Sequence, residues 1–285
     1  MKKLKVLGAV FATSLSLTSF AEVSTVAELP HYYNDAISVD KNDQMYVSNY
    51  GTGRVHGSVV TMNDGYGNNS EFVANLDGPL GSAFDKNGNF YVSSRHTGEI
   101  YRTDRNGRTE LFSHIQGGGG IAIDHDNDIY VASYDEKKIY KIDQKGNASV
   151  YSDDPLLQGG PVGISFDKYR NLYVGNYDDG KIIKITKKGE VSLVTTLTAG
   201  FNNVAYLVFA AGDIYATSIY ANKIFKVSVE GEVEVFAGSG GWGENNGENL
   251  EATFAYPNGI TTNKKETMLY VTEYFSKVVR AISID

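Results

Sequence analysis

The sequence of 285 residues contains no cysteine, which excludes disulfide bonds, thiolate metal sites and cysteine nucleophiles. It also lacks a G-x-S-x-G motif, the nucleophile elbow on which serine hydrolases of the α/β type depend. Histidine is scarce, and its five positions do not have the spacing of zinc ligands: His31, His56, His96, His114 and His125. Thiol chemistry, elbow-type serine chemistry and histidine-bound zinc are therefore not indicated.

Positive charge is also in short supply. The 26 lysines and arginines are outnumbered by 34 aspartates and glutamates, so the formal net charge is −8. Nucleic-acid-binding surfaces are typically basic, and we therefore expect no nucleic-acid partner. Apart from residues 6–20, no apolar run approaches the length of a membrane-spanning helix, so we expect no membrane anchor.

That single apolar run opens the chain and has the pattern of a secretory signal peptide. Three lysines lie within the first five residues, an apolar and small-residue run follows, and Ser19-Phe20-Ala21 fits the cleavage rule. A buried first helix is the alternative. The short basic start is typical of bacterial signals. We therefore predict a signal peptide over residues 1–21, a mature domain over 22–285, and a periplasmic or extracellular location.

Aromatic and β-branched residues, by contrast, are abundant and recur in a repeat. Gly119–Gly146, GGIAIDHDNDIYVASYDEKKIYKIDQKG, contains three strand-like runs separated by Gly, Asn and Asp. Its Tyr-Val strand recurs around six tyrosines spaced 45, 39, 43, 42 and 55 residues apart: Tyr46, Tyr91, Tyr130, Tyr173, Tyr215 and Tyr270. A four-strand unit repeated at this period predicts an all-β, six-bladed β-propeller of four-stranded antiparallel blades, rather than an irregular β-sandwich.

The repeats also predict how the ring closes. Blades 1 to 6 are expected over residues 34–76, 78–115, 117–153, 160–197, 202–237 and 257–285. The last blade lacks a fourth strand, whereas EVSTVAEL at residues 22–29 matches fourth strands elsewhere, such as EVSLVTTL at residues 190–197. We therefore expect Val23–Leu29 to pair with Lys277–Ile284, which would complete blade 6 and leave no free sheet edge.

The sixth repeat carries a resemblance to known families. Residues 237–260, AGSGGWGENNGENLEATFAYPNGI, followed by LYVTEYFSKVVRAI, resemble the NHL-repeat pattern of a Gly-rich loop, an Ala-x-Phe-x-x-Pro-x-Gly entry and a Tyr-Val strand. The Pro-Asn-Gly arrangement is also similar to the senescence marker protein/gluconolactonase family and its strictosidine-synthase-like relatives. The resemblance implies a six-bladed propeller, a fold that carries lactonases, lyases, synthases and binding domains alike.

In each blade, the start of the first strand lies beside the end of the antiparallel second strand, at one face of the central channel. This face is the default ligand pocket, for a small molecule or for a protein or peptide partner. Its polar and aromatic candidates are Asn34, Asp35, Asn49, Tyr50, Arg95, Tyr134, Asn176, Tyr177, Asn203, Asn258, Glu273 and Tyr274.

The gluconolactonase resemblance implies a divalent metal such as Ca²⁺ in the same channel, bound through oxygen ligands. Asp35 stands where the family has a glutamate, and Asn258 matches the asparagine of the family's Pro-Asn-Gly. Glu273 is a possible substitute for a further family aspartate, which this sequence lacks. Hard cations need several oxygen ligands, so this incomplete set leaves a hydrogen-bonded polar rim as the alternative. We expect all three side chains to face one space.

Two readings of function follow. The first is a secreted or periplasmic propeller that binds a small molecule or partner at the channel face. The second is a divalent-metal-dependent hydrolase of lactone or ester bonds, in which the metal would polarise a carbonyl and activate water. The incomplete set of metal ligands favours binding over hydrolysis, but the sequence does not decide whether the chain is an enzyme.

Two further segments carry expectations. Asp124-x-Asp126-x-Asp128 resembles part of a calcium loop, but similar turns in other repeats favour a hairpin turn. The Gly-rich segment Gly238–Gly247 carries the single tryptophan, Trp242. We expect this loop either to lie over one end of the ring and shape access to the pocket, or to pack as a plug between blades 5 and 6.

Overall fold

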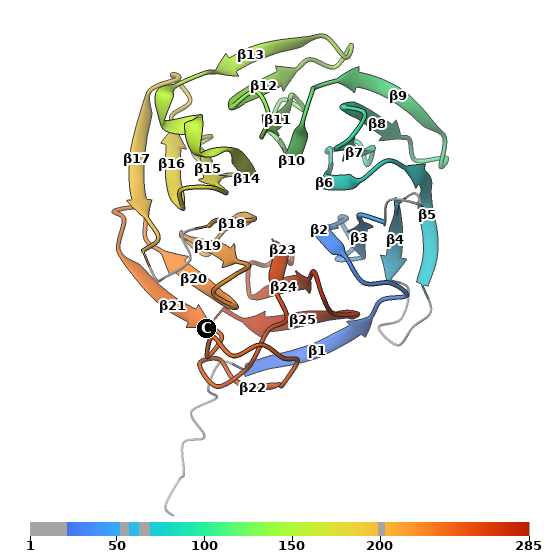
Figure 1. Cartoon of the computed structure of the whole chain (residues 1–285). Coiled ribbons are helices and arrows are strands. Elements are labelled where there is room, and N and C mark those ends of the chain that lie inside the picture. Colours follow the sequence, from blue (N-terminus) through green and yellow to red (C-terminus); the bar gives the residue numbers. More distant parts are fainter. Residues whose placement is uncertain (1–21, 52–56, 63–68, 199–202, 285) are drawn as a thin grey trace, which may run out of the picture.

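The computed structural model describes residues 22–51, 57–62, 69–198 and 203–284. Its strands form six antiparallel sheets arranged radially around a central channel, five of four strands and one of five (Figure 1). The predicted all-β, six-bladed β-propeller is therefore confirmed. The expected signal peptide over residues 1–21 lies outside the described residues. Among the described residues, no helix is long and apolar enough to cross a membrane.

Blades 1 to 3 each consist of four consecutive strands that follow one another from the channel outward (Figure 1). Blade 1 contains β2 (Asn34–Val39), β3 (Met45–Asn49), β4 (Gly57–Met62) and β5 (Asn69–Leu76). Blade 2 contains β6 (Pro79–Phe84), β7 (Phe90–Ser94), β8 (Glu99–Thr103) and β9 (Thr109–His114). Blade 3 contains β10 (Gly118–Ile123), β11 (Ile129–Ser133), β12 (Lys138–Ile142) and β13 (Ala148–Ser152).

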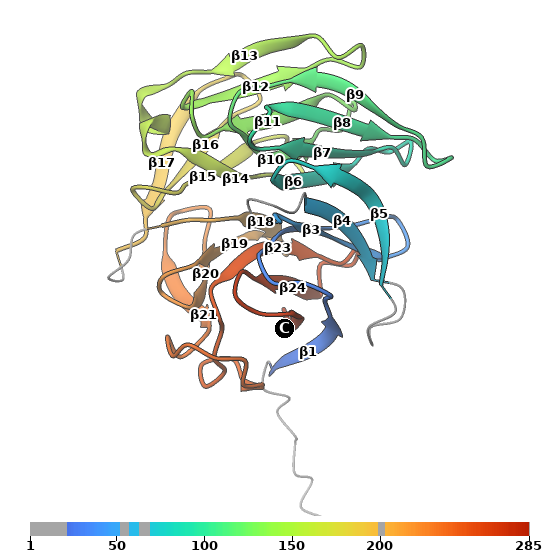
Figure 2. The same cartoon turned by 45° about the vertical axis from the view of Figure 1, so that its right-hand side comes forward.

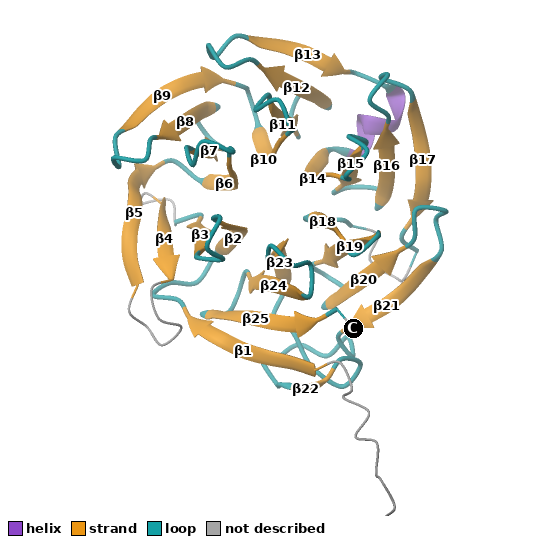
Figure 3. Ribbon diagram, turned by 180° about the vertical axis from the view of Figure 1, so that it is seen from behind, coloured by secondary structure: helices purple, strands orange, loops and turns teal. Residues whose placement is uncertain are grey.

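The remaining blades follow the same order. Blade 4 contains β14 (Pro161–Phe166), β15 (Leu172–Asn176), β16 (Lys181–Ile185) and β17 (Val191–Thr196), and the short 3₁₀ helix η1 (Pro155–Gly159) precedes it (Figure 3). Blade 5 contains β18 (Leu207–Ala210), β19 (Asp213–Ser218), β20 (Lys223–Val227) and β21 (Val233–Ala237). Blade 6 contains β23 (Pro257–Thr262), β24 (Met268–Glu273), β25 (Val278–Ser283), β1 (Glu22–Glu28) and β22 (Gly247–Glu248).

The ring closes through the N-terminal strand, as predicted. β1 runs antiparallel to β25, with Val23 opposite Ile282 and Glu28 opposite Val278. The sequence did not indicate the fifth strand: β22 of the Gly-rich segment pairs with the outer edge of β1, where Val23 lies opposite Gly247. The pairing covers the first two residues, Glu22 and Val23, of the outer edge of β1, and an exposed edge is a template for aggregation.

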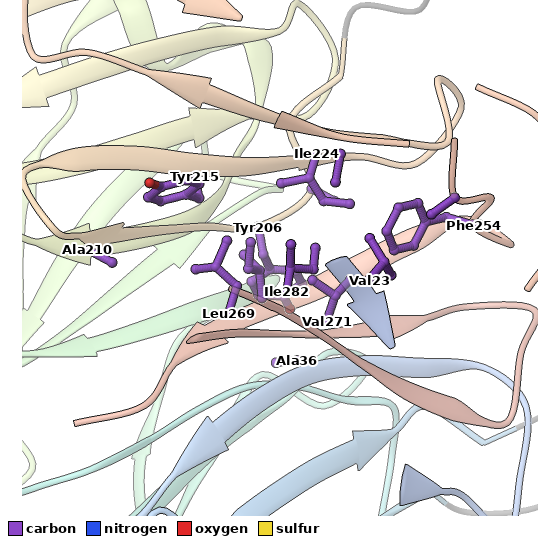
Figure 4. Packing of buried hydrophobic residues seen from close by; sticks show 14 residues of the cluster. Val23, Ala36, Tyr206, Ala210, Tyr215, Ile224, Phe254, Leu269, Val271 and Ile282 are labelled. Carbon is purple, nitrogen blue, oxygen red and sulfur yellow. The ribbon is translucent and has the colours of Figure 1, made fainter. Parts of the chain in front are cut away.

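The hydrophobic core lies between neighbouring sheets, which pack face to face (Figure 2). The second strand of each blade lies within this stacking, and every residue of β7, β11 and β15 is buried. In the cluster around blade 6, Val23 packs with Val271, Ile282 and Phe254 (Figure 4). Full burial of a side chain such as Phe254 contributes about 1.5–3 kcal/mol, so the closing strand is fastened by packing as well as by its ladder.

The turns between first and second strands lie at the end of the channel opposite the predicted pocket. In blade 3, the Oδ1 atom of Asp124 accepts the backbone N–H groups of Asp126 and Asp128 at 2.8 and 3.0 Å. The fourth residue of this turn has a left-handed φ in four blades, at Asp43 (61°), Gly88 (78°), Asn127 (64°) and Arg170 (69°). Asp124-x-Asp126-x-Asp128 is therefore a hairpin turn of the recurring kind, and its leading carboxylate is occupied by backbone donors.

Candidate functional site

Strand pairing brings the predicted positions to one end of the channel. Asn34 lies opposite Asn49 in blade 1, and Pro257 lies opposite Glu273 in blade 6. A pocket of about 480 Å³ opens there. Each blade contributes one residue from the start of its innermost strand or just before it, and we call this set the floor: Asp35, Leu80, Gly119, Val162, Tyr206 and Asn258.

The walls come from the ends of the second strands, from the turns that follow them and from Tyr256, which directly precedes β23. They are mostly aromatic, and six of their rings follow one another around the rim, continued by a seventh, Tyr33, which does not line the pocket. We call this set the aromatic arc: Tyr134, Tyr177, Tyr220, Tyr256, Phe275, Tyr274 and Tyr33. Successive ring centroids lie 6.2, 6.4, 5.9, 5.2, 5.1 and 5.3 Å apart, in edge-to-face or tilted geometry. Such pairs contribute about 0.5–1.5 kcal/mol each beyond their buried area, so the arc is held in place without a ligand.

Hydrogen bonds and ion pairs continue this ring of contacts between consecutive blades. The Tyr134 hydroxyl of blade 3 donates to Asp178 of blade 4 at 2.8 Å. Arg95 of blade 2 forms a two-pronged ion pair with Asp135 of blade 3, with both N–O distances at 2.7 Å. Its guanidinium charge therefore has a carboxylate partner before any ligand arrives.

The floor is polar only on the side of blades 5, 6 and 1. Asp35 Oδ1 accepts the Tyr206 hydroxyl at 2.6 Å, and Asp35 Oδ2 accepts the Asn258 side-chain amide at 3.0 Å. Burial raises the pKa of Asp35 from 3.8 to about 6, although these two hydrogen bonds oppose the shift. That difference favours the neutral acid by roughly 3 kcal/mol. Leu80, Gly119 and Val162 make the rest of the floor apolar or bare.

Seven of the twelve candidate residues line this pocket: Asp35, Tyr50, Arg95, Tyr134, Tyr177, Asn258 and Tyr274. Four predicted amides do not, and the expectation for them is corrected. Asn34, Asn49 and Asn176 donate their side-chain amides to backbone carbonyls, those of Ser276, Tyr32 and Leu156 respectively. Asn203 Oδ1 accepts the Ser218 hydroxyl at 2.9 Å. All four are buried beside the strand ends that they fasten.

The physical reason is the alternation of side chains along a strand. Successive side chains point to opposite faces, so neighbours such as Asn34 and Asp35 cannot both face the channel. The same alternation separates Asn176 from Tyr177 and Glu273 from Tyr274. In each of the last two pairs the second residue lines the pocket and the first is fully buried away from it.

Glu273 is the clearest correction, because it does not share a space with Asp35 and Asn258. Its carboxylate is fully buried inside blade 6, where Oε1 accepts Arg280 Nη1 at 2.8 Å and Oε2 accepts the backbone N–H of Ala255. Burial raises its pKa to about 7 against the opposing effects of those two donors. Arg280 also donates to the carbonyl oxygen of Asn245, so this pair ties the Gly-rich segment to the blade.

The donor set does not fit the divalent cation that the gluconolactonase resemblance implies. With Glu273 facing away, the floor offers one carboxylate and one amide, and Asn258 turns its N–H groups toward Asp35. Calcium takes six to eight oxygen ligands, with carboxylates prominent among them. In the part of the chain that the structure describes, no three His, Cys, Asp or Glu side chains are grouped as a metal centre would require.

Sequence reasoning missed four aromatic residues of the pocket: Tyr206, Tyr220, Tyr256 and Phe275. Tyr206 lies in blade 5, whose first strand lacks the Asp that closes this strand in other repeats, so the repeat alignment did not locate it. Tyr256 directly precedes the Pro-Asn-Gly motif, and Phe275 follows Tyr274. Tyr256 lies one residue before β23 and Phe275 two residues after β24, so a map extended two residues beyond the strand ends would have found both.

The Gly-rich segment lies away from the pocket. β22 pairs with the outer edge of blade 6 (Figures 1 and 3), and the Trp242 side chain is 65% exposed without lining the pocket. The expectation that this loop shapes access is therefore wrong, because its strand is held on the far side of β1. An exposed indole is also not a plug between blades.

Comparisons with known proteins agree with this architecture. The model of the Virginiamycin B lyase family matches residues 67–285. A catalytically inactive variant of virginiamycin B lyase from Staphylococcus aureus, solved with quinupristin, is 14% identical, with a TM-score of 0.68 over 93% of this chain and 100% of that chain. A gluconolactonase from Xanthomonas campestris is 12% identical, with a TM-score of 0.70 over 93% and 90%.

An auxiliary nutrient binding protein from Bacteroides ovatus is 17% identical, with a TM-score of 0.77 over 93% of this chain and 76% of that one. At these identities the solved structures show a shared fold and no more. A search of curated proteins found no match. The propellers of lyase, gluconolactonase and binding-protein relatives thus share this architecture, as the sequence resemblance implied.

Proposed function

The chain belongs to the Virginiamycin B lyase family, and from that premise we propose that it is an exported protein that binds a small organic molecule in its central pocket. One observation carries the proposal: a continuous aromatic arc stands over a floor whose polar groups are concentrated on one side. Small-molecule sites are typically concave, mostly apolar and furnished with a few fixed polar groups. The export part of the proposal rests on the signal-like residues 1–21.

The size and rigidity of the pocket support binding. A volume of about 480 Å³ suits a compact organic ligand. Contacts between consecutive blades, such as Tyr134 to Asp178 and Tyr177 to Tyr220, hold the rings in position. Binding to such a preorganised site loses little free energy to ordering of side chains. Metal-dependent hydrolysis of a lactone or ester has less support, because the floor lacks a carboxylate set for the metal.

A second candidate is elimination chemistry, which the floor and the family favour. Asp35 is a buried carboxylate with a pKa of about 6, in the range suited to a general base. In an elimination, Asp35 would take a proton from a carbon of the ligand. The electrons of that C–H bond would form a double bond, and the C–O bond at the neighbouring carbon would break. Tyr206 and Asn258 would orient the base through their hydrogen bonds.

Thermal denaturation with a panel of cyclic and aromatic compounds, quinupristin included, tests the binding proposal. At a hundredfold excess over Kd, a ligand should stabilise the protein by about 2.7 kcal/mol, which gives a clear rise in Tm. Tyr177→Ala should abolish the rise. The control Tyr169→Ala, which changes an exposed tyrosine of a hairpin turn at the other end of the channel, should preserve it.

Two results would contradict the proposal: no compound stabilises the protein, or both variants respond as the parent does. Liquid chromatography with mass spectrometry of any binding compound after incubation separates the candidate activities. Hydrolysis adds the mass of one water to the products, elimination that opens a ring gives an isomer of the same mass with a new retention time, and pure binding returns the compound with its mass and retention time unchanged.

A further inference from the structure

The charged side chains in and around the pocket differ in whether they have an ion-pair partner. Arg95 is paired with Asp135, and Lys137 at the rim lies 3.3 Å from Asp178. Asp35, by contrast, is 6% exposed and forms no ion pair within the described residues. Among the described residues that line the pocket, Asp35 is the single acidic one, and its neighbours on the floor are neutral.

The hydrogen bonds of Asp35 leave room for a further donor. An ionised carboxylate has about four acceptor sites. Tyr206 and Asn258 occupy one on each oxygen, and the backbone N–H of Ala36 contributes a further, weaker hydrogen bond. A buried carboxylate with neutral partners and spare acceptor sites is stabilised most by a cation that brings N–H donors. Such a group has to come from the ligand, because the described chain does not supply it.

The walls suit the same kind of group. Tyr50 of blade 1, Tyr177 of blade 4 and Tyr274 of blade 6 line the pocket on different sides of Asp35. Aromatic faces attract organic cations through their quadrupoles, by about 0.5–2 kcal/mol per favourable contact in measured systems. Burial is the main cause that raises the pKa of each of these three phenols, and the charge of Asp35 adds to it, so all three lie within its electrostatic reach.

We propose that the ligand carries a protonated amine, which donates hydrogen bonds to Asp35 while the tyrosine rings enclose its hydrocarbon portion. This inference rests on the proposed binding function and specifies the ligand class. The apolar side of the floor, Leu80 and Val162, would contact the part of the ligand that bears no charge. Carboxylate and phosphate ligands are disfavoured, because they would meet Asp35 as a like charge.

Isothermal titration calorimetry at pH 7.5 with a matched probe pair tests the inference. Phenethylamine is a cation at this pH, and 2-phenylethanol has nearly the same shape without charge. The wild-type protein should bind the amine at least tenfold more tightly than the alcohol. Asp35→Asn, which keeps the side-chain shape, should reduce that ratio to near one while leaving the affinity for the alcohol within about threefold.

Asp77→Asn is the matched control, because Asp77 is an exposed carboxylate within electrostatic reach of Tyr50 and does not line the pocket. It should keep the wild-type ratio. Far-UV circular dichroism and Tm establish that each variant is folded, and the amine-to-alcohol ratio of the wild-type protein needs no variant at all.

The outcomes separate the two proposals. Equal affinities for amine and alcohol in the wild-type protein, or a preference that survives Asp35→Asn, would overturn the amine inference and leave binding in the pocket intact. If neither probe binds and the wider panel also fails, both proposals fall. If the panel yields only neutral or anionic ligands, the amine inference alone is overturned.

Discussion

Two buried carboxylates of this protein, Glu273 and Asp35, have opposite surroundings. Glu273 lies inside blade 6, where it forms an ion pair with Arg280 and accepts the backbone N–H of Ala255. Asp35 lies on the pocket floor, where its partners Tyr206 and Asn258 are neutral. The difference teaches that burial alone does not mark a binding residue. A carboxylate with a cation of its own belongs to the structure, and one without is available to a ligand.

The Gly-rich segment shows what the first kind of carboxylate achieves. Glu273 holds Arg280, and the other guanidinium N–H groups of Arg280 reach the carbonyl of Thr253, the carbonyl of Asn245 and the side chain of Asn246. The ion pair therefore links the sheet of blade 6 to the segment that carries β22. On the pocket floor, Asp35 links blade 1 to blades 5 and 6 through neutral donors and has no counterion.

The largest expected effect comes from removing the charge of Glu273. Glu273→Gln would leave the guanidinium of Arg280 buried without a counterion, and breaking a buried pair in this way typically costs about 3–5 kcal/mol. Urea denaturation should show this loss in the free energy of unfolding. Glu251→Gln, an exposed glutamate of the same segment, should change it by less than about 0.5 kcal/mol. A loss below about 1 kcal/mol for Glu273→Gln would remove the distinction between the two carboxylates.

Asp35→Asn should raise the free energy of unfolding, whereas Glu273→Gln lowers it, and the size of the increase should depend on pH. The pKa of Asp35 is raised from 3.8 to about 6 on folding, so wild-type stability falls as pH rises from about 4 through 6. At pH 8 the variant should be more stable than the parent, by at most roughly 3 kcal/mol. At pH 4, where the carboxyl is protonated in the native state, the difference should nearly vanish.

Denaturation curves at pH 4 and pH 8 measure this effect, and Asp178→Asn provides the comparison with a partly exposed carboxylate. An equal difference between Asp35→Asn and the parent at both pH values would show that the effect arises from packing and not from the charge of Asp35.

The fold could be predicted from the sequence because it is fixed by a repeated backbone pattern. Tyrosines such as Tyr130 and Tyr173 recur at the same position in the second strand of each blade. This recurrence predicts the boundaries of the blades to within a few residues. The unpaired fourth-strand sequence at residues 22–29 has only one open edge to join, at blade 6. Both inferences depend on hydrogen-bonding pattern and period, which local sequence carries directly.

The site was predicted only in part because it depends on side-chain direction and on one irregular blade. The strand-end map identified Asp35, Asn258 and the recurring tyrosines, yet it did not apply the alternation that turns Glu273 inward. The ion-pair partner of Glu273 follows from the strand register. Val271 lies opposite Arg280 in the β24–β25 pair, and Glu273, two residues after Val271, lies on the same face of the sheet. Tyr206 could not be located, because the first strand of blade 5 departs from the repeat.

The smallest and most specific effect is expected for Tyr206→Phe, which removes one of the two donors to Asp35 and keeps the ring. The ionised carboxylate loses a hydrogen bond at 2.6 Å, so its pKa should rise above 6, and stability at pH 8 should fall by about 1 kcal/mol. A pH titration of the Asp35 side-chain carbon by NMR measures this directly. Tyr220→Phe removes a pocket hydroxyl that accepts a hydrogen bond from Tyr177, and should leave the titration of Asp35 near 6. If Tyr206→Phe also leaves it unchanged, Asp35 is not held by Tyr206, and the contrast with the ion-paired Glu273 has to rest on Asn258 and the backbone N–H of Ala36.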